Sequence, residues 1–113
     1  MAEERPSWQE KACPAWCVRE HQEDDMDGDR DHQSDAHYVP IIRMVRRFIG
    51  DKVARDLIAD ELIVAAFQAQ ADSRPSITIV LSEDARICLD LRDESAERVS
   101  EALTSILSQV GGR

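Results

Sequence analysis

The chain has 113 residues, of which 42% are hydrophobic and 33% are charged, a composition typical of one small globular domain. No apolar run approaches the ~18 residues of a membrane-spanning helix, and the N-terminus MAEERPSWQEK lacks the apolar core of a signal peptide. We therefore expect a cytoplasmic protein, and the odd number of cysteines, 3, argues against a disulfide framework.

The N-terminal third of the sequence divides into a tail and a segment that cannot build a core. Residues 1–11 are polar and aperiodic, which predicts a disordered tail ahead of a single domain over residues 12–113. Residues 12–37 contain few large apolar side chains. Hydrophobic burial alone therefore cannot order this segment.

This segment holds a cluster of potential metal ligands, namely all three histidines and two of the three cysteines of the chain. Cys13, Cys17 and His21 are spaced by four residues. On a helix with Pro14 in its first turn, their side chains would share one face. Two thiolates and one imidazole form a donor set that zinc prefers, with a fourth ligand completing a tetrahedron. We predict a structural Zn²⁺ site that ties residues 12–37 into a knuckle.

The fourth ligand of the predicted site is open between two later histidines, His32 and His37. A redox dithiol is a weaker interpretation of the cysteines, because no βαβ unit precedes them to place them at a helix N-terminus. Trp16 is expected to fold back over the metal site or the sheet. Cys88 lies far from this segment in an alternating stretch, and is predicted to be a buried small hydrophobic residue.

The net charge of −9 is concentrated in residues 20–35. This segment carries −7, from Arg30 and the acidic residues Glu20, Glu23, Asp24, Asp25, Asp27, Asp29, Asp31 and Asp35. A calcium-binding loop is excluded, because aligning Gly28 with its sixth position puts Ser34 where the bidentate glutamate belongs. We interpret the segment as a solvated acidic loop between metal ligands.

Residues 38–91 are predicted to form an antiparallel sheet. Residues 39–58 are ambiguous: their apolar positions fit one helical face, but their β-branched residues and the turn IGDK at residues 49–52 favour a hairpin. The stretches ELIVAAFQAQ, SITIVL and ARICLDL follow, each with alternating apolar residues and with polar turns between them. This pattern predicts the strands of a meander.

The last segment, residues 93–110, is predicted to be an amphipathic helix with acidic residues in its first turn and two glycines at its end. Its apolar stripe consists of Ala96, Val99, Leu103, Ile106, Leu107 and Val110. Because such a stripe has to be buried, we expect the helix to lie across the apolar face of the sheet. The predicted fold class is therefore α+β: an N-terminal zinc knuckle, an antiparallel meander and one C-terminal amphipathic helix.

The sequence favours a non-enzymatic regulatory or protein-interaction module over an enzyme. The zinc-deaminase pattern, a nucleophile elbow and a phosphate-binding loop are all absent, and no small-molecule substrate is inferred. We expect a protein partner or self-association. The alternative is a nucleic-acid-associated zinc protein acting through Arg43, Arg46 and Arg47, although the acidic loop would repel nucleic acid.

The stretch CPAWCVREH, with an acidic run and HQS after it, resembles the opening of a family of small uncharacterised domains from actinobacteria and their phages. ELIVAAFQ, RPSITIVL and LDLRDESAERVSEAL are similar to strands and the closing helix of that family, so the resemblance spans about residues 13–110. It implies that His32, in the His-x-Ser pattern, is the fourth ligand, and that residues 39–58 are strands. Asp93 departs from the family, which often has proline at the helix start. The resemblance implies no activity.

Overall fold

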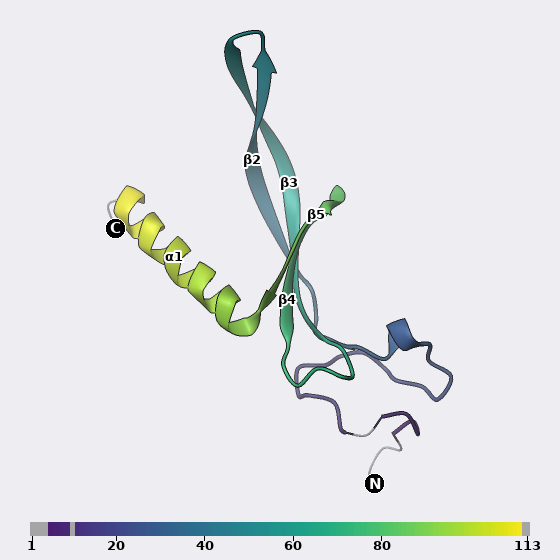
Figure 1. Cartoon of the computed structure of the whole chain (residues 1–113). Helices are drawn as coiled ribbons and strands as arrows, with labels where there is room; N and C mark the ends of the chain where they lie inside the picture. The colour runs from purple at the N-terminus through teal and green to yellow at the C-terminus, as the bar shows by residue number, and fades with distance from the viewer. Residues whose placement is uncertain (1–4, 10, 112–113) are drawn as a thin grey trace.

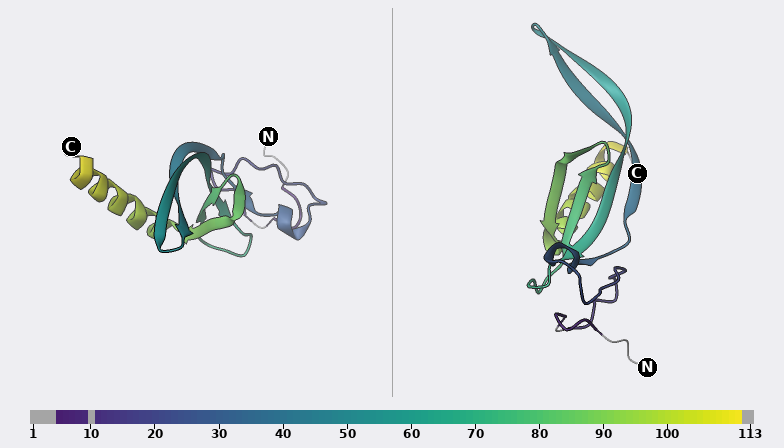
Figure 2. Two further views of the ribbon diagram at one scale, coloured as in Figure 1. Left: turned by 90° about the horizontal axis from the view of Figure 1, so that it is seen from above. Right: turned by 90° about the vertical axis from the view of Figure 1, so that its right-hand side faces the viewer.

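The structure is a computed structural model that describes residues 5–9 and 11–111. Its elements are the 3₁₀ turn η1 (Asp27–Asp29), the strands β1 (His32–Gln33), β2 (His37–Ile49), β3 (Lys52–Gln68), β4 (Ser76–Leu81) and β5 (Asp84–Arg92), and the helix α1 (Asp93–Gly111). All the strands belong to one curled antiparallel sheet, and the N-terminal loops gather at one end of it (Figures 1 and 2). The predicted α+β class is therefore confirmed at the level of a sheet with one C-terminal helix.

Strands β2 and β3 form a long hairpin, so the strand interpretation of residues 39–58 is confirmed and the helical one is wrong. The ladder runs from His37↔Val64 to Ile49↔Lys52 without interruption. Gly50 takes the first of the two turn positions with φ 63°, as a type II′ turn requires. The β-branched residues of the segment and the turn at Gly50 favour the hairpin, and they outweigh the helical spacing of the apolar residues.

Half of this hairpin extends beyond the rest of the sheet. β4 pairs only with residues 62–67 of β3, so residues 41–60, which we call the outer arm, form a two-stranded ribbon (Figure 1). The two ion pairs Arg43–Asp60 and Arg47–Asp56 cross the ribbon at 3.0 and 2.6 Å.

The body of the sheet is the predicted meander of β3, β4 and β5, with β1 added at the end of β3. Leu81, 3% exposed, is the one apolar side chain classed as buried among the residues that the structure describes. The prediction that Cys88 is buried is wrong, because it lies exposed on β5, the edge strand of the sheet within the described residues.

Helix α1 forms as predicted, but it does not lie across the sheet. It follows β5 without a connecting residue, and among the elements it contacts only β4 and β5 (Figure 2). Arg74 fixes its first turn through Asp93 at 2.8 Å and Glu94 at 2.7 Å. With no loop in which the chain could reverse, the helix projects away from the sheet, and its apolar stripe is exposed from Val99 to Val110, whereas Ala96 is half-buried. Within the described residues, no helix is long and apolar enough to cross a membrane.

Candidate metal centre

The segment from Cys13 to His21 is a turn followed by irregular chain, so the predicted short helix is wrong. The Cys17 N–H donates to the Pro14 carbonyl at 3.0 Å, which closes one turn. The next N–H, that of Val18, donates to the Gln33 carbonyl at 2.9 Å instead of continuing a helix. This bond joins the loop to β1, the strand that begins at His32.

The four predicted ligands nevertheless converge. One ligand atom from each of Cys13, Cys17, His21 and His32 lies within 4.8 Å of all the others. The Sγ of Cys17 is 3.8 Å from the Nε2 of His21. Ligands of a tetrahedral zinc ion are separated by about 3.3–3.8 Å, given metal–ligand bonds of about 2.0–2.3 Å. These four residues could hold a metal ion.

Of the two histidines that the residues alone left open, the structure brings His32 to the cluster. His32 is 7% exposed and pairs through β1 with Gln68 at the end of β3. His37 lies exposed at the start of β2 and is not in the group. That His32 binds metal remains a prediction.

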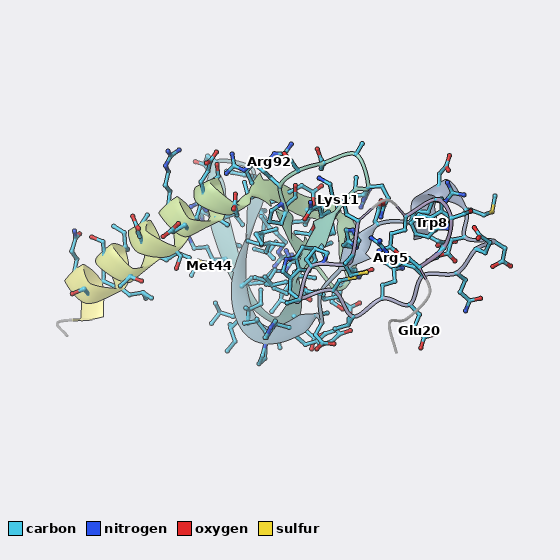
Figure 3. All side chains as sticks on the ribbon, turned by 90° about the horizontal axis from the view of Figure 1, so that it is seen from below. Arg5, Trp8, Lys11, Glu20, Met44 and Arg92 are labelled. Carbon is cyan, nitrogen blue, oxygen red and sulfur yellow. The ribbon has the colours of Figure 1, made fainter. Side chains whose placement is uncertain are left out.

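One tryptophan ring lies roughly perpendicular to the ring of each of the two histidines. The ring of Trp8 lies 5.4 Å from that of His21, and the ring of Trp16 lies 6.5 Å from that of His32. The indole N–H of Trp8 donates to the Gln22 carbonyl at 2.8 Å, and the Arg30 guanidinium lies 5.0 Å from the Trp8 ring. Figure 3 shows Trp8 among the loops at the end of the molecule opposite α1. Trp16 thus lies beside the candidate ligands, as expected, whereas the sequence analysis missed Trp8.

Two further polar side chains contact the ligands and were also missed. The Gln9 amide N–H donates to the Cys13 sulfur at 3.2 Å, and Gln9 is 6% exposed. A carboxylate oxygen of Asp25 lies 3.9 Å from the Nδ1 of His21, beyond hydrogen-bond distance, and this nitrogen is buried without a hydrogen-bond partner among the described residues. A carboxylate behind a histidine orients the ring of a metal ligand. Asp25 follows His21 by four residues, continuing the spacing of the ligands, and this spacing could have identified it.

The N-terminal residues contribute to this packing. The backbone N–H of Ser7 donates to both carboxylate oxygens of Glu23 at 3.1 Å. Part of the predicted tail therefore contacts the acidic loop, and residues 1–4 and 10 of that tail lie outside the described residues. The acidic loop is accordingly more than a solvated connection, because Glu23 and Asp25 both accept hydrogen bonds from the chain around the cluster.

The environment favours the neutral imidazole of His32 and disfavours the thiolate of Cys13. Burial, with the charge of His21 nearby, lowers the pKa of His32 and keeps its imidazole neutral, the form that binds metals. Burial of its sulfur and the neighbouring Cys17 raise the pKa of Cys13, while the Gln9 N–H opposes this shift. The Nδ1 of His32 is buried without a hydrogen-bond partner, and its Nε2 lies 3.4 Å from the Gln70 amide nitrogen. A buried nitrogen without a partner is costly, and a metal bond would satisfy it.

Comparison with curated proteins and with solved structures found no match to this chain. The family model described as "Domain of unknown function (DUF6907)" matches residues 3–113, nearly the whole sequence, so the chain belongs to this family of uncharacterised domains.

Proposed function

We propose that this protein is a small zinc-binding protein whose Zn²⁺ is structural and is held by Cys13, Cys17, His21 and His32. The observation that carries the proposal is the convergence of these four donor atoms within 4.8 Å from separate parts of the chain. Two sulfur and two nitrogen donors favour zinc over the hard cations that prefer oxygen. Four protein ligands complete a tetrahedron and leave no position for a substrate, which is typical of a structural site.

In this proposal, the zinc supplies the stability that the knuckle lacks from apolar burial. The knuckle then anchors the N-terminal loops to β1 and to the end of β3. The protein acts as a regulatory or protein-interaction module in the cytoplasm, where thiols stay reduced, and not as an enzyme.

The nucleic-acid alternative has less support. Arg43 and Arg47 already form ion pairs with Asp60 and Asp56, so they offer less charge to phosphate groups. Retention of the protein on a DNA column at low salt, lost when salt is added, would revive this alternative.

The metal proposal is tested by elemental analysis of the purified full chain. We expect one zinc ion per chain, loss of zinc in Cys17→Ser and His32→Ala, and retention of zinc in the matched control His37→Ala. A natively folded wild-type chain without metal would contradict the proposal. Zinc retained in His32→Ala and lost in His37→Ala would contradict the assignment of the fourth ligand.

A further inference from the structure

The chain exposes much more surface than a compact monomer of its size. Its accessible surface is 9110 Å² for a mass of 12.8 kDa. A compact monomer of that mass exposes about 6,300 Å², so the excess is about 2,800 Å². Each subunit of an obligate homodimer buries about 1,000–2,500 Å². The exposed excess is therefore large enough to supply such an interface.

One part of this excess is an apolar face on the outer arm. Cross-strand partners in the β2–β3 ribbon share a face, and one face consists mainly of apolar side chains, each 43–76% exposed: Ile42, Met44, Phe48, Val53 and Leu57. The ion pairs of the ribbon lie on the opposite face. Met44 lies on the side of the molecule from which α1 extends (Figure 3).

The second part is the stripe of α1, where five apolar residues are 43–76% exposed: Val99, Leu103, Ile106, Leu107 and Val110. The stripe is about 17 Å long at 1.5 Å per residue. The arm face from Ile42 to Phe48 is about 20 Å long at about 3.3 Å per residue. The two surfaces match in length, but α1 and the arm of the same chain extend in different directions and do not contact each other (Figure 1).

The outer arm and α1 carry charges of opposite sign. Arg46 lies directly opposite Arg55 on the apolar face of the arm, and neither has an acidic partner among the described residues. Like charges in this position repel each other. Helix α1 carries a net charge of −3, and its Glu97 and Glu101 lie on the side of the helix away from the apolar stripe, as Ser105 does. The acidic helix is attracted to the arm over a longer range, and the contact itself rests on the apolar side chains of the two surfaces.

We propose that two copies of this chain form a homodimer in which α1 of each copy lies on the apolar face of the outer arm of the other. A two-fold axis makes the two helix–arm contacts identical and closes the assembly. This inference rests on the proposed interaction function, because it names the partner which that function leaves open, but it does not depend on the zinc.

The experiment measures molar mass by light scattering after size exclusion, together with zinc content, on the same samples. We expect a dimer for the wild-type chain and an increase of the dimer Kd by about 100-fold or more for Leu103→Glu and for Leu57→Glu. Both side chains are exposed in the single chain, so neither change disturbs its fold. The matched controls are Ser105→Glu on the far side of α1 and Ile49→Glu on the ion-paired face of the arm, which keep the dimer.

A monomeric wild-type chain would overturn the proposal, and so would a dimer that survives either Leu103→Glu or Leu57→Glu. A monomer with one zinc ion per chain overturns the dimer alone, whereas a dimer without zinc overturns only the metal proposal. Disulfide capture then tests the pairing directly in a Cys88→Ser background. Chains carrying Met44→Cys are mixed with chains carrying Leu103→Cys, and we expect a cross-linked species that neither chain forms alone. Cross-links within each population and none between them would reject the helix–arm contact.

Discussion

Asp25 and Gln9 contact the candidate ligands without belonging to the ligand set. Asp25 faces the Nδ1 of His21, and Gln9 donates to the sulfur of Cys13. Such contacts hold a ligand in one orientation and reduce the cost of ordering it when a metal binds. The ligand types were predictable from the sequence because cysteine and histidine carry their chemistry with them. Gln9 was not predictable, because glutamine is common on every surface, and only the four-residue spacing after His21 distinguishes Asp25 from the other acidic residues around it.

Asp25→Asn is expected to lower the zinc affinity by about 10–100-fold, because the amide removes the negative charge behind His21 while keeping the size of the side chain. The affinity is measured by competition with a chromogenic chelator. Asp24→Asn is the matched control, since Asp24 is an exposed neighbour with the same charge. An equal effect of the two variants would mean that only the overall charge of the loop matters.

At the level of elements, the turn of the β2–β3 hairpin depends on one glycine. Gly50 has φ 63°, a conformation that residues with a side chain rarely adopt, and its position leaves open space around an added Cβ. Any cost of a substitution there therefore comes from the backbone and not from a collision. The sequence IGDK predicted this turn because its chemistry is local.

Gly50→Ala is expected to lower the free energy of unfolding by about 1–2 kcal/mol, because the left-handed backbone conformation is sterically unfavourable for a residue with a Cβ atom. Urea denaturation followed by circular dichroism measures the change. Gly28→Ala provides the control: its site is equally open but has no positive φ, so we expect a change within about 0.5 kcal/mol. A Gly50→Ala chain as stable as the wild type would show that the turn takes another conformation.

At the scale of the whole molecule, the hydrogen bonds between the candidate metal centre and the sheet are concentrated around β1 within the described residues. The Val18 N–H donates to the Gln33 carbonyl, and the Ser34 N–H donates to the Ala66 carbonyl, both at 2.9 Å. The β3–β4 pairs of the meander contain no candidate ligand, and His32 in β1 is the candidate ligand that pairs with β3. The knuckle should therefore lose its order without the sheet unfolding.

Removal of zinc by a chelator is expected to speed amide hydrogen exchange at Val18 and Ser34 by more than about tenfold, while the β3–β4 pairs keep their protection. Exchange followed by NMR before and after chelation gives both values in one experiment. A uniform loss of protection over knuckle and sheet would show that the metal supports the entire fold. No change anywhere would contradict a structural role for the metal.

Local pattern was enough to predict the strands of the meander, the hairpin turn, the C-terminal helix and the residue types of the candidate metal centre. Each of these depends on residues close in the chain, whose periodicity or side-chain chemistry acts over a few positions. The same reasoning failed where partners are distant. Cys13, Cys17 and His21 meet through a turn and a bond from Val18 to Gln33, not along a helix. The direction of α1 depends on its direct junction with β5. The apolar stripe in the sequence does not show whether its own sheet or a second chain covers it, because the hydrophobic effect is non-directional.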